Sequence, residues 1–206
     1  MLWGGHNGEL ELRRAPGGAT RLRGRFPYNK RAVLSDGGKT GRPRKEVIAS
    51  RAFAYRVDDP KEDIHLLIGH SYDRPLASRG AGTLDLKDTA DALLFDAVIT
   101  DEMREVSWVK DALAAIGAGL ILGISPGFRI PPERAVKDAE TVEDEGSDPE
   151  NGMHNAIIRT VHAALLYELS LVTRPAYPEA QIEARDWRNG DIGAANLVMH
   201  LNRWRL

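Results

Sequence analysis

The chain has 206 residues, 42% of them hydrophobic and 28% charged, with a formal net charge of -2 at pH 7. This size and composition predict one globular domain that buries its own core. The charge balance argues against a nucleic-acid binder, and the absence of cysteine excludes disulfides, thiolate catalysis and Cys-ligated zinc. Residues 1–8 hold no signal-peptide core, and no apolar run reaches the ~20 residues of a membrane span. We therefore expect a cytoplasmic protein that binds neither membranes nor nucleic acid.

The first quarter of the chain is predicted to form short strands. Glu9–Arg14 alternates apolar and charged residues, as a half-buried strand does, and a second strand is expected over Thr20–Phe26. Ser35–Lys45 is rich in Gly, Lys and Arg and is interpreted as a mobile loop. Val47–Phe53 is predicted to be a short helix.

The middle of the chain combines strands with one clear helix. Ile64–His70 is a short apolar run bounded by turn signals, which indicates a buried strand. Thr83–Leu86 and Leu93–Ile99 are predicted to form a hairpin. Apolar residues at helical spacing then follow Thr100, a good N-cap, and Gly117 and Gly119 are expected to end the helix.

The last third changes character. Leu120–Ser125 has the pattern of a strand, whereas residues 134–155 are acidic and poor in apolar side chains, so we expect a flexible excursion there. Ala156–Val172 returns to strand-like patterning, and residues 186–206 are predicted to form a helical tail on a main domain of residues 1–185. The fold class expected is β-rich α+β: a closed or nearly closed β-barrel of about seven strands with surrounding helices.

Two of the six histidines, His65 and His70, lie five residues apart. In a strand this odd offset places their side chains on opposite faces, which argues against a shared metal site, and an H-E-x-x-H motif is absent. His70 lies at the end of the apolar run, where catalytic groups are often found. His65 stands between two apolar residues, as a core residue does. We expect no metal and no cofactor, and we take His70 as the candidate for catalysis.

Ser125 lies in Gly123-Ile124-Ser125-Pro126-Gly127, which fits the G-x-S-x-G spacing literally. No helix pattern follows, so the strand–turn–helix context of an α/β-hydrolase is missing. A preceding strand would hold this serine rigidly with its hydroxyl toward a cleft. The competing interpretation is an ordinary Ser-Pro-Gly turn, which composition alone favours.

Glu168 lies in an alternating segment, Tyr167–Thr173. Alternation predicts that Glu168 and Ser170 share one face and that Tyr167 lies on the other. A buried carboxylate needs a partner, and a carboxylate beside a histidine orients the ring and stabilises its cation. The alternative is a surface glutamate.

Three segments together resemble the prohead protease family of tailed phages: Gly69–Leu76, Gly123–Phe128 and Tyr167–Ala176. Ala52-Phe53 is similar to the family's Gly-Ala-Phe element, and the resemblance runs from about Phe26 to Ala184. The family is similar in turn to the herpesvirus capsid-maturation proteases of the assemblin type. Those have a closed β-barrel ringed by helices and a Ser-His-His triad.

The resemblance implies a serine endopeptidase with Ser125 as nucleophile, His70 as base and Glu168 as the group that orients His70. Such chemistry is self-consistent, because a serine hydroxyl needs an adjacent base and a histidine both accepts and returns the proton. Pro126 departs from the branched apolar residue more usual in the family. Gly69 departs as well, since the family often has a polar residue before the histidine.

The source of the oxyanion donors is a separate question. Pro126 has no N–H, so the residue after the nucleophile cannot donate. We expect oxyanion or substrate contacts from Gly127, Thr173 and Arg174, the last through the backbone or a water bound to its side chain.

The resemblance also implies a biological setting. The expected substrates are the scaffold protein or scaffold-like segment of the major capsid protein, and the protease itself. The expected location is the interior of an assembling procapsid in the bacterial host, with a homo-oligomer, plausibly a dimer, as the working form. Two other interpretations stay open: a non-catalytic capsid-assembly or scaffold protein with the same barrel, and an unrelated β-barrel binding module in which Ser125 is a turn residue.

Overall fold

The computed structural model describes residues 2–3, 9–14, 19–38, 41–121, 123–151 and 153–173, the first two ranges as backbone only. The expected tail, residues 186–206, lies outside the described residues, so the division of the chain at residue 185 stays a prediction. The elements, in chain order, are β1 (Leu2–Trp3), β2 (Glu9–Arg14), β3 (Thr20–Pro27), β4 (Arg31–Ser35), β5 (Arg44–Ile48), α1 (Ala54–Val57), β6 (His65–Ile68), β7 (Ser71–Ser78), β8 (Leu84–Asp88), β9 (Ala92–Ile99), α2 (Asp101–Glu105), α3 (Ser107–Gly117), β10 (Gly123–Arg129), β11 (Glu140–Asp144), β12 (Ser147–Asp148), η1 (Pro149–Asn151), β13 (Met153–His154), β14 (Ile157–Val161) and β15 (Leu165–Val172).

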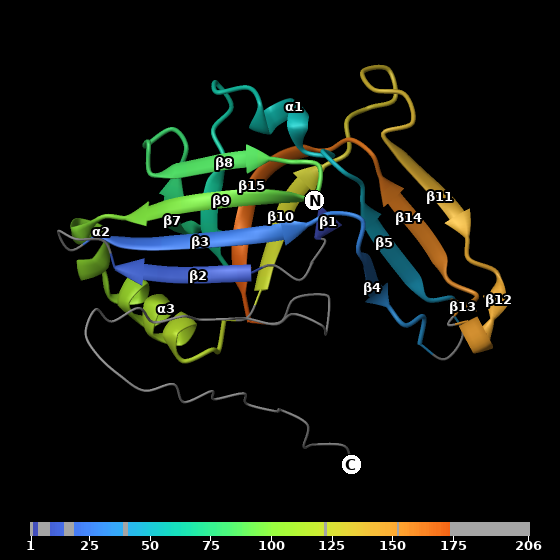
Figure 1. The fold of residues 1–206 in the computed structure, drawn as a ribbon, viewed down its shortest axis with the longest axis horizontal. Coiled ribbons are helices and arrows are strands. Elements are labelled where there is room, and N and C mark those ends of the chain that lie inside the picture. The colour runs from blue at the N-terminus through green and yellow to red at the C-terminus, as the bar shows by residue number, and fades with distance from the viewer. Residues whose placement is uncertain are drawn as a thin grey trace, which may run out of the picture.

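Two sheets pack face to face around the main core (Figure 1). One has the strand order β1-β10-β15-β6-β7, and the other has the order β2-β3-β9-β8. Gly24 of β3 lies in a crowded part of this core: a Cβ there would overlap the ring of Phe95 on β9 and lie 2.7 Å from Cδ1 of Ile124 on β10. A glycine at this point leaves room for the Phe95 ring and for the facing layer.

The expected β-rich α+β fold is confirmed, because strands dominate the described residues and the helices are few and short. The strand pairing of the described residues closes no sheet into a barrel. The closed barrel therefore stays a prediction.

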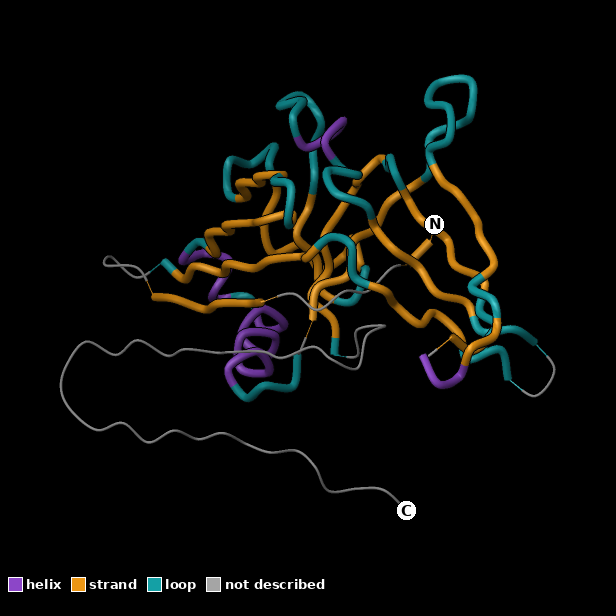
Figure 2. Tube along the Cα trace, turned by 45° about the vertical axis from the view of Figure 1, so that its right-hand side comes forward, coloured by secondary structure: helices purple, strands orange, loops and turns teal. Residues whose placement is uncertain are grey.

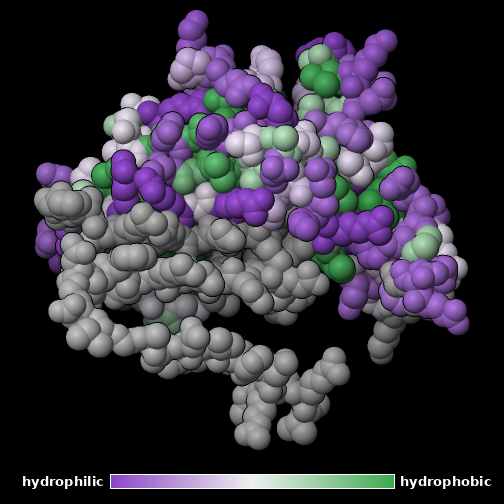
Figure 3. Space-filling model, in the orientation of Figure 1, coloured by the Kyte–Doolittle hydropathy of each residue, from purple (hydrophilic) through white to green (hydrophobic). Residues whose placement is uncertain are grey.

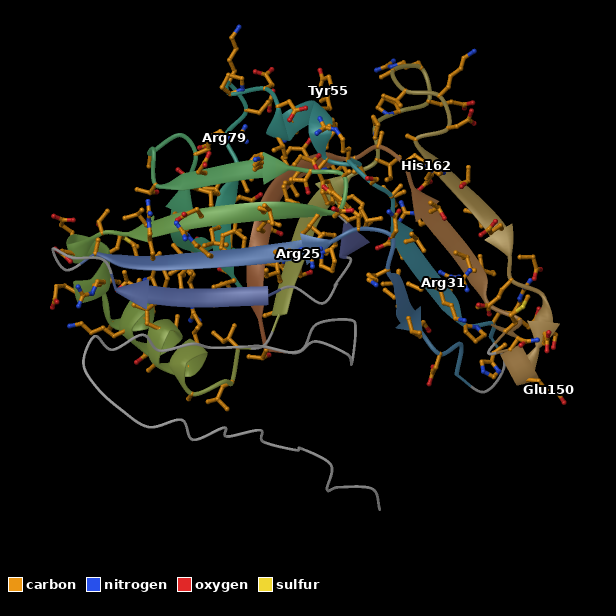
Figure 4. The ribbon with its side chains drawn as sticks, viewed as in Figure 1. Arg25, Arg31, Tyr55, Arg79, Glu150 and His162 are labelled. Atoms are coloured by element: carbon orange, nitrogen blue, oxygen red, sulfur yellow. The ribbon has the colours of Figure 1, made fainter. Side chains whose placement is uncertain are left out.

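A third sheet, β11-β14-β5-β4, extends to one side of the two packed layers (Figures 1 and 2). Arg31 lies on this sheet, and His162 and Glu150 lie toward its two ends (Figure 4). Its two central strands, β5 and β14, pair in parallel, so that Val47 lies opposite Thr160.

The third sheet bears on two expectations. Within residues 134–155, which are expected to form a flexible excursion, the described residues include β11, β12, η1 and β13. Flexibility of this stretch stays a prediction. Its charges are paired: the buried Glu145 forms an ion pair with Lys45 and accepts backbone N–H groups from His154 and Ala156. The Lys45 ammonium also lowers the pKa of the Glu145 carboxyl below its ordinary value. Pairing of this kind compensates for the scarcity of apolar side chains.

The helix expected over Val47–Phe53 is wrong. Val47 and Ile48 end strand β5, because they pair in parallel with β14 and their β-branched side chains favour a strand. The helical turn comes later, at α1. The strand expected over Leu120–Ser125 begins instead at Gly123, because Leu120 and Ile121 close the end of α3 by donating to the Ala115 carbonyl.

The N-cap and hairpin predictions are confirmed, whereas the single helix expected after Thr100 is two helices, α2 and α3. The Met103 N–H donates to the Thr100 hydroxyl, as the N-cap prediction requires, and Gly119 ends the helical region with φ +69°. The helix is interrupted at Val106, whose extended backbone separates α2 from α3. Strands β8 and β9 form the predicted hairpin.

The hydropathy of the surface is consistent with an apolar core between the sheets. The face seen in Figure 3 is mostly hydrophilic over the described residues, with hydrophobic side chains in small separate patches. No helix in the described part of the chain is long and apolar enough to cross a membrane.

Candidate active site

His70 lies in a two-residue turn between β6 and β7. Ile68 pairs with Ser71, and both central residues have positive φ, 59° for Gly69 and 62° for His70. Type I′ hairpins require this conformation at both positions, and histidine is one of the few non-glycine residues that adopt it with some frequency. The turn is attached to β15, because the Gly69 N–H donates to the Leu171 carbonyl at 3.0 Å. The turn that carries the histidine is therefore held by the pairing of β6 with β7 and by a hydrogen bond to β15.

Glu168 is the partner of the His70 ring. Glu168 lies on β15, is fully buried, and its Oε1 lies 2.8 Å from His70 Nδ1. Its other oxygen, Oε2, accepts the hydroxyl of Ser170 at 2.7 Å. Both carboxylate oxygens thus have partners, as a buried charge requires. The prediction of a buried, paired glutamate beside His70 agrees with this geometry, and a surface glutamate does not.

Ser170 connects the carboxylate to the histidine turn. Its Oγ donates to Glu168 and accepts the backbone N–H of His70 at 2.9 Å. One fully buried hydroxyl therefore sets the position of the carboxylate and of the histidine backbone at once. Sequence reasoning placed Ser170 on the Glu168 face but assigned it no role; the only available signal was their spacing of two residues.

Ser125 lies on β10, directly opposite Ser170 in the antiparallel ladder, and is buried. Opposite residues of an antiparallel pair point to the same face, with Cβ atoms roughly 5 Å apart. The register therefore brings Ser125 to the face of the sheet that carries Ser170 and Glu168. The ordinary Ser-Pro-Gly turn is excluded here, because Ser125, Pro126 and Gly127 all lie within β10.

Gly127 leaves space for the Glu168 carboxylate. Gly127 lies opposite Glu168, and a Cβ at this position would come within 2.6 Å of Glu168 Cδ and nearer still to Oε1. The second glycine of the G-x-S-x-G sequence thus has a steric function unlike its function in a nucleophile elbow. Its expected role in oxyanion or substrate contacts stays a prediction.

A β-bulge follows this pair and corrects one expectation. Gly127 pairs with Glu168 but Phe128 pairs with Leu166, so that Tyr167 is the extra residue. The Tyr167 ring lies 5.4 Å from the guanidinium of Arg129, which shares the Gly127 face by alternation. Tyr167 therefore lies on the Glu168 side, and not on the opposite face as simple alternation predicted.

His65 and Tyr72 lie beside this site. His65 pairs in register with Glu168, and its ring packs edge-on against Tyr72 with centroids 5.7 Å apart. The parity argument that separated His65 from His70 does not apply, because β6 ends at Ile68 and His70 belongs to the turn. Burial raises the pKa of the Tyr72 phenol, and the nearby Glu168 charge adds to this shift.

Two further predicted residues lie at or beyond the end of β15. Thr173 is exposed directly after the strand. Arg174 lies outside the described residues. In the described part of the chain, no group of three or more His, Asp or Glu side chains has the arrangement of a metal site.

One comparison with known proteins identifies a family for the chain. The family profile described as caudovirus prohead serine protease matches residues 34–191, which include the histidine turn, β10 and β15. Comparison with curated proteins and with solved structures finds no match. Since the family match covers most of its length, the chain belongs to the caudovirus prohead serine proteases.

Proposed function

We propose that the chain is a serine endopeptidase in which Ser125 is the nucleophile, His70 the general base and Glu168 the group that orients His70. The observation that carries the proposal is the hydrogen bond between His70 Nδ1 and Glu168 Oε1 on a buried carboxylate. A carboxylate at Nδ1 selects the tautomer in which Nε2 is basic and stabilises the imidazolium once it forms.

The chemistry follows from these roles. Ser125 Oγ attacks the scissile carbonyl carbon while His70 Nε2 takes the hydroxyl proton. Collapse of the tetrahedral intermediate breaks the C–N bond, and His70 gives its proton to the leaving amine. A water molecule then attacks the acyl-enzyme ester with His70 again acting as base, which releases the acid and restores Ser125. Glu168 keeps its hydrogen bond to His70 Nδ1 throughout.

We further propose that the oxyanion donors come from outside the Ser125-Pro126 peptide. Pro126 has no N–H, so Gly127, Thr173 and Arg174 supply the oxyanion or substrate contacts. Arg174→Ala is expected to reduce the rate of cleavage more than Pro126→Ala. Equal rates for Arg174→Ala and wild type would contradict a contribution from the Arg174 side chain.

The proposed substrates follow from family membership. They are the scaffold protein or scaffold segment of the major capsid protein, and the chain itself, cleaved inside the assembling procapsid of the host cell. We also propose that the chain works as a homo-oligomer. The two packed sheets are proposed to close into a barrel.

Co-expression with the major capsid protein of the same phage tests the proposed function. We expect a shortened capsid-protein band with the wild-type chain and a full-length band with Ser125→Ala. The Ser125→Ala variant removes one buried oxygen and is expected to keep the fold, which circular dichroism verifies. Identical band patterns for the two chains would contradict the proposal.

A further inference from the structure

A group of arginine and tyrosine side chains lies next to Glu168 and has no part in the proposed triad. The Tyr167 ring has the guanidinium carbon of Arg56 at 4.2 Å from its centroid and that of Arg129 at 5.4 Å. Two cations at these distances from one aromatic ring form a positively charged surface with an apolar floor.

The charges of this group do not balance. Arg56 forms an ion pair with Glu62, whereas no carboxylate in the described part of the chain lies within ion-pair distance of Arg129. Arg129 is also exposed. In addition, the buried Arg56 Nη1 has no hydrogen-bond partner among the described residues. The group therefore has one exposed positive charge, that of Arg129, with no carboxylate partner among the described residues.

The element that presents Arg56 is held firmly. The guanidinium of Arg79 donates to the backbone carbonyls of Arg56, Val57, Asp59 and Glu62 at 2.8–3.2 Å. Helix α1 and the following turn are thereby fixed against the end of β7. Tyr55, in the same helical turn, points away into solvent (Figure 4). Arg56 thus has a defined position, as a binding residue requires.

The register relates this group to Ser125. Ser125, Gly127 and Arg129 alternate along β10 and share the face that carries Glu168. Four residues of strand correspond to ~13 Å at about 3.3 Å per residue, which an extended peptide spans with a similar number of residues.

We propose that Arg129, Tyr167 and Arg56 form a subsite that binds an acidic side chain of the substrate, roughly four residues from the scissile bond. The carboxylate pairs with the exposed Arg129, while its methylene groups pack on the Tyr167 ring and Arg56 adds positive charge behind that ring. This inference rests on the proposed function, because it requires a peptide bound along β10 next to Ser125.

Cleavage-site profiling tests the subsite. Wild type, Arg129→Glu, Arg129→Lys and Arg134→Glu are incubated with peptides from a chymotrypsin-digested bacterial proteome, and the cut sites are identified by mass spectrometry. We expect wild type to enrich Asp or Glu at one position about three to five residues from the cut. Arg129→Glu should lower the cleavage of such peptides about tenfold and favour Lys or Arg there, because a carboxylate then faces a carboxylate.

Two variants serve as controls. Arg129→Lys is expected to keep the acidic preference in weaker form. Arg134→Glu makes the same charge change at an exposed loop position and should leave the profile unaltered.

The outcomes separate the two proposals. Cleavage without acidic enrichment, an unchanged profile in Arg129→Glu, or an equal change in Arg134→Glu would overturn the subsite alone. If wild type produces no cleavage beyond that seen with Ser125→Ala, the proposed function itself is contradicted.

Discussion

At the scale of single residues, the site depends on how one buried carboxylate is held. Glu168 Oε1 is hydrogen-bonded to the His70 ring, and Glu168 Oε2 accepts the Ser170 hydroxyl. Ser170 also accepts the backbone N–H of the strained His70 turn. We interpret Ser170 as a positioning residue that acts through Glu168 and His70.

Ser170→Ala tests this role. The change leaves Glu168 Oε2 and the His70 N–H without their partner, so we expect kcat to fall about 10- to 100-fold while KM changes little. The cost in folding stability should be about 1–3 kcal/mol. Ser170→Thr keeps the hydroxyl and should recover most of kcat; steady-state kinetics on a cleaved peptide measure both. A wild-type kcat in Ser170→Ala would show that the hydroxyl does not act on the reaction.

Gly127→Ala tests the space beside the carboxylate. The new Cβ would overlap Glu168, so the carboxylate must leave its place at His70, and we expect cleavage to fall below detection. Gly117→Ala is the matched control, because a Cβ there meets no atom within 4 Å. That control should be as active as wild type and no less stable by thermal unfolding. Full activity of Gly127→Ala would refute the steric role.

At the scale of elements, the buried Asp88 carboxyl at the end of β8 should make the folding stability depend on pH. Tyr28 donates to Asp88 Oδ1 at 2.7 Å, and Asp88 Oδ2 is buried with no hydrogen-bond partner among the described residues. Burial raises the pKa of the Asp88 carboxyl, an effect that the Tyr28 hydrogen bond only partly offsets.

Asp88→Asn tests this pH dependence. A carboxyl whose folded pKa exceeds its unfolded pKa, about 3.9, favours folding when protonated and loses that contribution as pH rises through the folded pKa. Asparagine keeps the acceptor for Tyr28 without a charge. The stability of Asp88→Asn relative to wild type should therefore increase as pH rises from about 4 to 7 in urea unfolding. A pH-independent difference would show that Asp88 does not titrate with folding.

The elements also show what the sequence could predict. Strands and caps with a local signal were identified correctly, among them β3, the β8–β9 hairpin and the Thr100 cap. Errors arose where a distant partner decides the conformation, as when β14 makes Val47 a strand residue. In the site, motif order gave His70, Ser125 and Glu168 as candidates, and their roles stay predictions. The bulge at Tyr167 and the strands β11, β12 and β13 depend on pairing between strands, which a single sequence does not reveal.

At the scale of the whole molecule, Phe53 lies where the three sheets meet. Its ring is 5.6 Å from Phe128 of β10, and 6.1 Å from Phe26 of β3 and from Tyr28. The neighbouring Ala52 carbonyl accepts the N–H of Ala164, between β14 and β15. The Ala52-Phe53 element therefore joins the third sheet to the layers that carry the site.

Phe53→Ala is expected to destabilise the molecule by about 3–5 kcal/mol, because the side chain is fully buried and its loss leaves a cavity. Phe53→Leu should cost less, since it refills part of that volume. Thermal unfolding measures both variants. Equal unfolding temperatures for wild type and Phe53→Ala would contradict this account of the junction.

Ser125 is proposed to be a nucleophile activated by His70. Diisopropyl fluorophosphate tests it directly, because an activated serine Oγ displaces fluoride and retains the phosphoryl group. We predict one adduct per chain, located on Ser125 by peptide mass spectrometry, absent from Ser125→Ala and strongly slowed in His70→Ala. An adduct on another residue, or labelling of Ser125 at the same rate in His70→Ala, would contradict the account.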